Sequence, residues 1–419
     1  MPAAALYVHV PFCAQKCRYC DFDSRALRAC DREQAMDVYF EKLAHRLDVF
    51  ATTGALDAIE TVYIGGGTPS LAGEHLVALT KRISDTCHPV EFTCEANPES
   101  MTGPLARTLK SSGVTRISLG VQSLVPRELA AIGRIHTAER ALGALSVCKA
   151  AGLVVSCDLM CGLPRQTSES WSQTLAGILE ADPDHVSVYP LTLEEGTPLA
   201  LAAENDPSLV PDEDFQADCM ETARRVLAER GYAPYEVASY AKPGYACAHN
   251  IAYWTGRGYL GLGRSAAGML DRVDFDALAT LFPGVEVPPD AARVRMVQLD
   301  DEASAFDAEF LTARETAAED LMLGCRMTAG ISPAVLHRAS NVIPLDALIG
   351  ACEHAVELGL ASWRPDGNAP RPDPHATDGI DPRDVISGSV NAHLAPTQLG
   401  WLDGNVLFEL FWELSGTLV

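Results

Sequence analysis

The chain has 419 residues, 47% of them hydrophobic and 7% aromatic, which is enough for two or three domains with a sizeable core. Its 56 acidic residues outnumber its 32 basic residues, giving a net charge of −24 with no basic cluster, so a nucleic-acid surface is not expected. No apolar run reaches 18 residues and no basic leader precedes the first strand, so we expect a cytoplasmic protein without an integral membrane segment.

Short apolar segments rich in β-branched residues alternate with helical stretches in the first half of the chain. Strands are expected at 6–10, 61–67, 91–97, 116–122, 154–162 and 185–191. Helices are expected at 33–52, 71–87, 101–112, 138–151, 168–180 and 212–230. Since this alternation is typical of a parallel sheet and a closed barrel has eight units, we expect an α/β fold with a partial (βα)6 TIM-like barrel over residues 1–230.

The pattern changes after residue 230. Residues 231–305 are expected to extend the barrel, with a strand and its loop at 232–244 and ordered loop and turn at 248–263. Residues 306–419 are expected to form a smaller helical, winged-helix-like domain. It would have two amphipathic helices from Glu309 to about Leu360, a Pro- and Asp-rich solvated loop at 364–394, and helical periodicity at the C-terminus. In so acidic a chain, packing is favoured over DNA contact for this domain.

Three cysteines, Cys13, Cys17 and Cys20, form a C-x3-C-x2-C run directly after the first expected strand. The other ten of the 13 cysteines are scattered without paired spacing, unlike a disulfide framework. A structural zinc site normally has four protein ligands, whereas a [4Fe–4S] cluster held by three thiolates leaves one iron free for an external ligand. An iron–sulfur cluster is therefore favoured, with a zinc site or inert loop thiols as the alternatives.

Together these motifs resemble the radical S-adenosylmethionine (SAM) superfamily, in which the free iron of the cluster binds SAM. The chain is most similar to the branch that contains anaerobic coproporphyrinogen III dehydrogenases and HemW-type heme chaperones, through LYVHVPFC, YIGGGTPSL, EANPES, RISLGVQS, DLMCGLPRQT and YPLTLEEGTPL. Phe22 stands where the dehydrogenases typically carry a further cysteine, and they also have an N-terminal extension before the first strand. The form C-D-F-x-S, here CDFDS, is usual in the heme chaperones and favours them.

The resemblance implies a SAM site formed by Tyr7, Tyr19, Gly66, Gly67, Thr68, Glu95, Gln122, Arg134 and Asp158. Backbone can approach a ligand closely at the glycines, and Glu95 can accept from the SAM ammonium. Gln122 and Asp158 can hold ribose hydroxyls, and Arg134 can neutralise the SAM carboxylate. Each of these roles has an ordinary alternative. Glu95, Gln122 and Asp158 could each be a polar group at a strand end with its hydrogen bonds satisfied, and Arg134 could be a surface or salt-bridge arginine. By its spacing alone Tyr7 would be a core residue.

A second signature, H-N-x-x-Y-W, is matched by His249, Asn250, Tyr253 and Trp254, and the resemblance implies that these residues take part in heme binding. A neutral imidazole is a suitable axial ligand for heme iron, and the two aromatic rings could flank a porphyrin. On chemistry alone, a turn-capping histidine with packed aromatics is favoured. The family match favours a role of these residues in heme binding, but it does not favour His249 as the iron ligand. Cys247 is another conceivable iron ligand, although a buried structural cysteine is the favoured interpretation.

Three residues depart from the family pattern. Ala267 in GLGRSAAG stands where a histidine is frequent, which weakens a ligand scheme that uses that histidine. Cys161 and Arg165 replace a common tyrosine and glycine near the expected ribose site, where they should only adjust its shape.

The expected function is therefore that of a heme chaperone that binds a [4Fe–4S] cluster, SAM and heme. Its partners would be an electron donor for the cluster and an acceptor protein for the heme, and peripheral contact with a membrane-bound acceptor is compatible with this. The alternative is an oxygen-independent coproporphyrinogen III dehydrogenase that decarboxylates propionates through a SAM-derived radical. A third interpretation is a binding protein with a structural metal loop. The sequence does not decide whether the protein is an enzyme that cleaves SAM.

Overall fold

The computed structural model describes residues 3–365 and 380–417. Within them, a curved twelve-stranded sheet has the order β14-β13-β12-β11-β1-β4-β5-β6-β7-β8-β10-β9. The six predicted strands are confirmed as its parallel centre: β1 (Ala5–Val10), β4 (Thr61–Gly66), β5 (Glu91–Ala96), β6 (Arg116–Gln122), β7 (Val154–Cys161) and β8 (His185–Pro190). Their carboxyl ends meet at one edge, where a partial barrel places its ligands.

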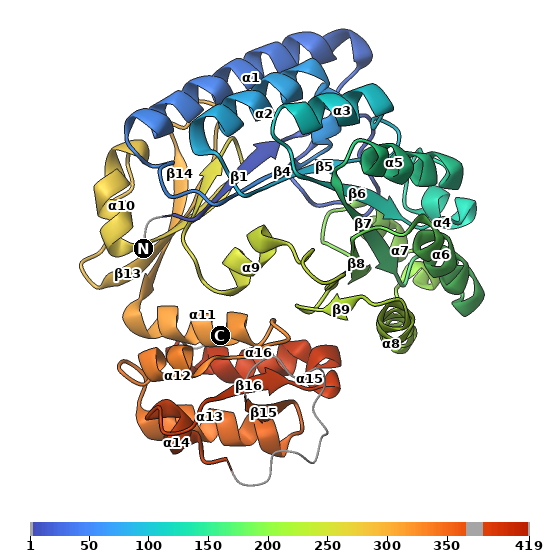
Figure 1. Ribbon diagram of the computed structural model, residues 1–419. Coiled ribbons are helices and arrows are strands. Elements are labelled where there is room, and N and C mark those ends of the chain that lie inside the picture. The colour runs from blue at the N-terminus through green and yellow to red at the C-terminus, as the bar shows by residue number, and fades with distance from the viewer. Residues whose placement is uncertain (1–2, 366–379, 418–419) are drawn as a thin grey trace.

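The six predicted helices are also present and cover the outer face of the sheet (Figure 1). They are α1 (Ala29–Thr52), α2 (Glu74–Cys87), α3 (Gly103–Ser111), α5 (Ala138–Ala150), α6 (Ser168–Ala181) and α8 (Glu213–Glu229). Short connections add α4 (Pro126–Ala131), α7 (Pro198–Ala203), η1 (Pro69–Ala72) and η2 (Pro207–Leu209). Threonine oxygens at Thr102, Thr137 and Thr167 accept from the first-turn amides of α3, α5 and α6, which fixes where these helices begin.

The barrel core lies between the sheet and these helices. The face of the central strands that packs against the helices is apolar, as in Val62 and Ile64 of β4, which are fully buried, whereas the inner face carries polar residues such as Thr93 of β5. From the helical side, Trp171 of α6 is buried and its indole N–H donates to the carbonyl of Cys219 in α8 at 2.9 Å. This packing holds the strand ends rigidly and so fixes the positions of the loops that follow them.

The prediction of loop and turn at 248–263 is wrong. This segment contains α9 (Ala248–Trp254) and β11 (Tyr259–Leu262), and β11 pairs parallel with β1 on the side away from β4. Its glycines suggested a loop, but Gly261 is a strand residue whose added Cβ would lie 2.5 Å from the carbonyl oxygen of Ala267. Glycine here permits close packing of β11 on β12, so a tertiary contact overrides the local turn signal.

Further strands extend both edges of the sheet. On one edge β12 (Ala267–Asp271), β13 (Ala291–Gln298) and β14 (Phe306–Thr312) follow β11 in antiparallel order, with α10 (Arg272–Leu278) and η3 (Ala279–Leu281) between β12 and β13. On the other edge the segment predicted as a strand with its loop forms β9 (Ala233–Pro234) and β10 (Ser239–Ala241), which pairs with β8. Helix α9 lies on the inner side of the sheet (Figure 1).

The remaining elements form a second hydrophobic core below the barrel (Figure 1). They are α11 (Ala313–Gly324), α12 (Pro333–Ala339), α13 (Leu345–Glu357), β15 (Ala361–Pro365), α14 (Pro382–Ile386), β16 (Ala392–Pro396), α15 (Gln398–Leu402), α16 (Gly404–Trp412) and η4 (Glu413–Ser415). The predicted C-terminal helical region is confirmed, with a two-stranded β15–β16 sheet added.

Two expectations for this region need correction. Between residues 309 and 360 the structure has three helices, α11, α12 and α13, where two were expected. Glu309 is not helical, because it lies in β14, which pairs with β13. The solvated loop expected at 364–394 is partly wrong: residues 366–379 lie outside the described residues, but β16 and α14 occupy much of the remainder. The polar composition of this segment masked short apolar stretches that are buried in the structure, such as Val385 and Ile386.

Candidate functional site

A cavity of about 360 Å³ opens at the carboxyl ends of the parallel strands. Most of the residues predicted from sequence for cluster and SAM line it: Cys13, Cys17, Tyr19, Cys20, Gly66, Gly67, Thr68, Glu95, Gln122, Arg134 and Asp158. These residues are spread along the sequence from Cys13 to Asp158. The sheet therefore gathers them because each follows the end of a parallel strand.

The cysteine loop is tied to the barrel at several points. It begins at β2 (Phe12–Cys13), which pairs with β3 (Arg25–Ala26). The amide of Arg18 donates to the carbonyl of Ile132 at 3.0 Å, and Asp23 accepts from Arg264 and Ser265 at 2.9 and 2.5 Å. Phe22 is 57% exposed at the end of this loop. The loop is thus anchored without help from a bound ligand.

The three thiols differ in their surroundings. Cys13 is buried, and the hydroxyl of Thr68 lies 3.7 Å from its sulfur; Cys17 lies 3.6 Å from Nη1 of Arg134. Burial raises the pKa of Cys13 and of Cys20 above the ordinary thiol value. Without a metal these two thiols hold their protons, and a bound metal would displace them.

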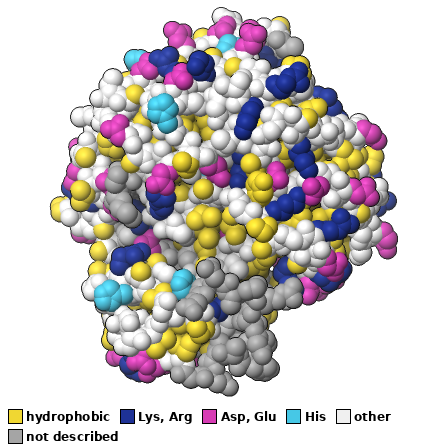
Figure 2. Space-filling model, in the orientation of Figure 1, with side chains coloured by type: hydrophobic (Ala, Val, Ile, Leu, Met, Phe, Trp, Pro, Cys, Tyr) yellow, Lys and Arg dark blue, Asp and Glu magenta, His cyan; other side chains and the backbone are white. Residues whose placement is uncertain are grey.

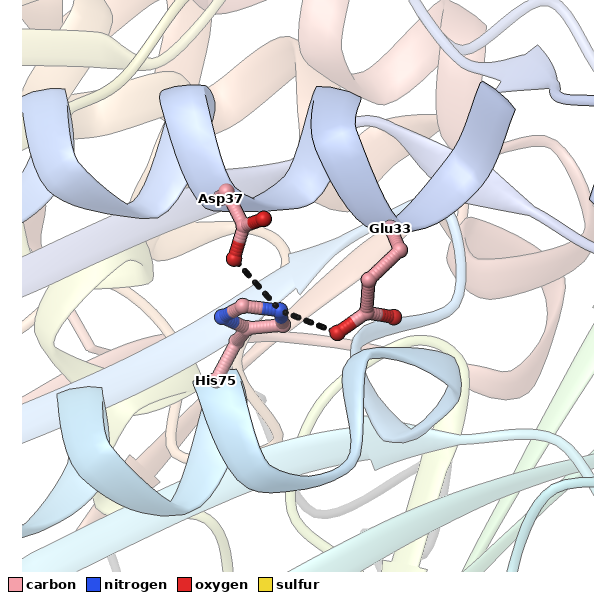
Figure 3. A group of neighbouring side chains, drawn as sticks. All are labelled: Glu33, Asp37 and His75. Carbon is pink, nitrogen blue, oxygen red and sulfur yellow. Dashed lines mark hydrogen bonds and ion pairs between the residues drawn. The ribbon is translucent and has the colours of Figure 1, made fainter. Parts of the chain in front are cut away.

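The spacing of the thiols distinguishes two kinds of metal site. A single zinc ion holds thiolates at about 2.3 Å, and hence roughly 3.8 Å from one another. Among the residues that the structure describes, the group of three His, Cys or carboxylate ligand atoms lying within 4.8 Å of one another is the surface cluster Glu33, Asp37 and His75 between α1 and α2 (Figure 3). A [4Fe–4S] cluster instead binds each thiolate to a different iron, and three thiolates leave its fourth iron free.

The glycine turn after β4 leaves no room for side chains. A Cβ on Gly66, whose φ is +111°, would lie 2.5 Å from the ring of His9. A Cβ on Gly67 would lie 2.7 Å from the carbonyl oxygen of Phe12, the residue before the first cysteine. These glycines bring the backbone of the turn against the cysteine loop and leave it facing the cavity.

Two carboxylates stand on the strand ends deep in the barrel. Glu95 accepts from the hydroxyl of Tyr63 at 2.9 Å and the amide of Gly66 at 3.1 Å, and burial raises its pKa to about 7. Asp158 accepts from Ser118 at 2.8 Å, and burial raises its pKa to about 6. A cationic ligand in the cavity would favour the ionised form of both groups.

Arg134 and Gln122 complete the predicted set. Arg134 donates to Oδ1 of Asn97 at 2.8 Å and to the carbonyl of Gly120, and so reaches from its loop across the cavity to β6. Gln122 has a φ of +65° beside a bulge in the pairing of β6 with β7. The bulge and the left-handed conformation together change the course of the chain at this strand end.

Tyr7 does not line the cavity. Its hydroxyl lies 3.1 Å from Nδ1 of His9, and its ring stacks on Tyr63 with the ring centroids 6.3 Å apart. Nε2 of His9 in turn contacts the carbonyl of Asp23 at 2.8 Å. Tyr7 therefore supports the cysteine loop from behind.

The sequence analysis missed a group of polar residues in the same cavity. Asn97 bridges Thr68 (3.0 Å) and Arg134, and its position in EANPES, after the third parallel strand, was the signal that could have revealed it. The others lie along the strands β6, β7 and β8: Arg116, Ser118, Ser156, His185, Ser187 and Tyr189.

The H-N-x-x-Y-W residues lie on α9, and of these only Asn250 lines the cavity. His249 is 4% exposed, its Nδ1 is 3.0 Å from the hydroxyl of Thr61, and its ring lies between Tyr63 and Tyr253. Burial lowers its pKa to about 4, and its Nε2 has no hydrogen-bond partner. His249 is thus neutral near pH 7, with one free nitrogen.

The rest of α9 is held by packing. Tyr253 stacks on Tyr259 with centroids 4.1 Å apart, and the guanidinium of Arg326 lies 4.4 Å from the ring centroid of Trp254. Glu91 accepts from Cys247 and from the amides of Ala248 and His249, which fixes the start of the helix.

None of the helices in the described part of the chain is both long and apolar enough to cross a membrane. On the face shown in Figure 2, lysine and arginine side chains are interspersed with acidic and apolar ones.

Comparisons with known proteins show the family to which the chain belongs. Residues 7–176 match the family model described as the Radical SAM superfamily. The protein from Haemophilus influenzae named Heme chaperone HemW is 38% identical over 276 residues, which cover 64% of this chain and 71% of that protein. The Escherichia coli protein of the same name is 37% identical over 285 residues, covering 67% and 74%.

A solved structure agrees with the fold. The structure titled as coproporphyrinogen III oxidase (HemN) from Escherichia coli, a radical SAM enzyme, matches with a TM-score of 0.73 at 19% identity, over 100% of this chain and 91% of that one. At this identity the match shows the fold alone. The family-model match and the relatives, together with the fold, define a radical SAM protein. Within that superfamily, the chain belongs to the family of the heme chaperones named HemW.

Proposed function

We propose that the protein is a cytoplasmic heme chaperone of the radical SAM type, which binds a [4Fe–4S] cluster, SAM and heme and passes heme to an acceptor protein. The observation that carries the first part is the convergence of three thiols, two buried carboxylates and a side-chain-free glycine turn on one cavity. The relatives named heme chaperone support the second part.

Cys13, Cys17 and Cys20 would hold the cluster, and Thr68 and the glycine turn lie beside the cysteine loop. In the proposed site Glu95 accepts from the SAM ammonium, and Arg134 lies beside Cys17, where it can pair with the SAM carboxylate. Gln122 and Asp158 bind the ribose, and Tyr19 packs beside the cluster. A cluster and SAM bound there would allow one-electron reduction of SAM to methionine and a 5′-deoxyadenosyl radical.

Helix α9 would take part in heme binding. The free Nε2 of His249 is a candidate axial ligand, since a buried imidazole that stays neutral binds iron without losing a proton. Reaching a heme iron would require the packing of His249 between Tyr63 and Tyr253 to open. Asn250, Tyr253 and Trp254 are proposed as the other heme-binding residues of the helix.

The alternative, coproporphyrinogen III dehydrogenase, has the observation of a HemN-like fold in its favour. The exposed Phe22 argues against it, because a further thiol is expected there in the dehydrogenases. Both functions use the same cluster and SAM site, so only the substrate separates them.

The test is made on anaerobically reconstituted protein. Hemin is titrated while the Soret band is followed, and the same protein is separately given dithionite, SAM and coproporphyrinogen III. We expect saturable hemin binding, weakened in His249→Ala, and no decarboxylation. Stoichiometric protoporphyrinogen together with 5′-deoxyadenosine would establish the dehydrogenase and refute the chaperone.

A further inference from the structure

A second cavity, of about 700 Å³, lies where the barrel meets the C-terminal elements, and we call it the junction cavity. One wall comes from α8 and β9, and the other from Thr328, β15, β16 and α15. In Figure 1 it lies between β9 and α8 above and α15 below. It shares no lining residue with the first cavity and none with α9, so it is separate from the cluster, SAM and heme sites proposed above.

The walls of the junction cavity are mainly apolar. Tyr232 and Pro234 line one side, and Pro396 and Trp401 line the other. Leu399, also in the wall, is 47% exposed, so its apolar side chain is left in contact with water. The volume is within the range of small-molecule pockets, and walls of this kind favour a ligand with an apolar body.

The charged side chains in these walls have one sign. Arg224 and Arg364 line the cavity, and none of the described residues that line it is acidic, although the chain has 56 acidic and 32 basic residues. Arg364 is 7% exposed and donates to the carbonyls of Thr328 (3.1 Å) and Pro396 (2.8 Å). None of the described carboxylates forms an ion pair with it, and a buried cation held only by carbonyl groups favours an anion beside it.

The two arginines contact one short segment of the wall. Arg364 donates to the carbonyl of Pro396, and Arg224 donates at 2.9 Å to the side chain of Gln398, two residues further along the chain. Their positive charges therefore lie on the same part of the wall. Arg224 also lies 3.7 Å from Glu221, but this carboxylate is half-exposed and does not line the cavity.

Hydrogen-bond donors in these walls are in excess of acceptors. Nε of Arg224, Nε of Arg364 and Nε1 of Trp401 are buried nitrogens without a hydrogen-bond partner in the described part of the chain, and all three belong to residues that line the cavity. Buried donors are normally paired with an acceptor. The walls thus lack an acceptor of the kind that the oxygens of an anion supply.

We propose that the junction cavity binds a small amphipathic anion, a straight-chain molecule with its carboxylate or phosphate head at Arg224 and Arg364. The apolar body of this ligand lies against Tyr232, Leu399 and Trp401. Arginine suits both head groups, because its planar guanidinium pairs with carboxylate and phosphate oxygens alike. The ligand is a different molecule from the heme of the proposed function, and the inference holds whether or not the protein carries heme.

A ligand at this place joins the barrel to the C-terminal elements. Arg224 belongs to α8 and Arg364 belongs to β15, so one head group paired with both arginines bridges the two sides of the cavity. A ligand that binds only the folded protein stabilises it. The thermal midpoint of unfolding should therefore rise as the concentration of the anion increases.

The experiment uses the full chain and three ligands that share a straight chain of the same length and differ in the head group: decanoate, decyl phosphate and decanol. Each is used below the concentration at which it forms micelles, and binding is followed by displacement of the fluorescent anion anilinonaphthalene sulfonate. We expect saturable displacement by decanoate, by decyl phosphate or by both, and the comparison of the two identifies the head group. Decanol should bind at least about tenfold more weakly, because charge-assisted bonds to arginine are absent.

Two pairs of variants locate the site. Arg224→Gln is compared with Arg225→Gln, at its more exposed neighbour on α8, which forms an ion pair with Glu229. Leu399→Asp is compared with Leu402→Asp, at a similarly exposed residue of α15 outside the cavity wall. Arg224→Gln and Leu399→Asp should weaken binding of the anion by about tenfold, and the two control variants should not. Thermal unfolding without ligand shows that each variant is folded.

Three results would overturn the inference. If neither anion displaces the probe from the wild-type protein, the cavity does not take this class of ligand. If decanol binds as well as the anions, the arginines do not recognise a head group. If Arg224→Gln and Leu399→Asp bind the anion as their controls do, the anion lies elsewhere on the molecule. None of these results bears on the chaperone function, which the hemin titration tests separately.

Discussion

At the scale of single residues, the site depends on groups whose protonation is controlled by burial. Cys13 and Cys20 have raised pKa values, as do Glu95 and Asp158, because the barrel withdraws them from water. The charged form of each of these groups is thus unfavourable unless a positively charged partner is bound beside it. The proposed cluster irons and the SAM cation supply that charge, so ligand binding and ionisation are coupled.

The first prediction concerns the cluster. Cys17→Ala should abolish the visible iron–sulfur absorption after anaerobic reconstitution, because two thiolates cannot replace three. Iron and sulfide content measured on the same samples checks the result. Cys30→Ala, at an exposed cysteine outside the run, is the matched control and should retain both. An intact cluster in Cys17→Ala would show that other ligands hold it.

The second prediction concerns pH. Since the pKa of Glu95 is raised to about 7, the ionised form that accepts from an ammonium is lost as the pH falls through 7. SAM affinity, measured by equilibrium dialysis, should therefore decrease by up to about tenfold per pH unit below 7. Asp158, with a pKa of about 6, adds to the loss at lower pH. Glu95→Gln should bind more weakly at pH 8 and show a flatter profile; an unchanged slope would exclude Glu95 as the titrating group.

At the scale of elements, short contacts between loops and strands hold the site in place. The ion pair from Asp23 to Arg264 joins the cysteine loop to the turn between β11 and β12. The glycines of the β4 turn and Gly261 of β11 permit backbones to pack closely on either side of β1. The β11 strand therefore serves the site indirectly, by supporting β1 and the loop that follows it.

The third prediction tests the Asp23 anchor. Asp23→Ala removes its bonds to Arg264 and Ser265, so the cysteine loop should open more often. The reconstituted cluster should then lose iron faster in air, by several-fold, with little change in thermal midpoint since the loop is exposed. Asp31→Ala, which breaks the exposed surface pair with Arg28, is the control and should decay as the wild type does.

The fourth prediction tests the packing of β11. In Gly261→Ala the new methyl would lie 2.5 Å from the carbonyl oxygen of Ala267, so the strands must separate. The free energy of unfolding in urea should fall by about 1–3 kcal/mol, as for other overpacked sites. Gly143→Ala, in α5 with open space around it, should instead gain up to about 1 kcal/mol. A neutral Gly261→Ala would mean that β11 is not packed as described.

At the scale of the whole molecule, the barrel and the C-terminal elements are joined through buried charge. Arg293 of β13 is 3% exposed and forms ion pairs with Glu319 (2.9 Å) and Asp320 (2.8 Å) of α11. These links fix the orientation of α11 below the sheet. A cavity of about 700 Å³ between the two parts depends on that orientation, since α8 and β9 line it on one side and β15, β16 and α15 on the other.

The fifth prediction follows from this joint. Arg293→Met removes the ion-pair partner of the largely buried Asp320 and leaves Glu319 with Arg295 alone, which should cost about 3–5 kcal/mol in the free energy of unfolding. Thermal and urea unfolding give the measurement. Arg225→Met, which breaks an exposed pair on α8, should change stability very little. Equal effects of the two substitutions would show that the buried cluster does not hold the joint.

The sequence by itself determined the six parallel strands, their helices and most of the cluster and SAM candidates. It could do so because strand ends, glycine turns and cysteine spacing are local signals, and parallel pairing brings successive strand ends to one edge. It did not predict β11, the packing behind Tyr7 or the burial of His249, because these depend on residues far apart in the chain. From the sequence, Gly261 predicts a turn, and only the packing of β12 against β11 explains a glycine within a strand. Likewise, the hydrogen bonds of Asn97 to Thr68 and Arg134 depend on the fold that brings the three residues together. The cavity between the barrel and the C-terminal elements, too, exists only in the tertiary structure, because Arg224 and Arg364, which both line it, lie 140 positions apart and no local pattern relates them.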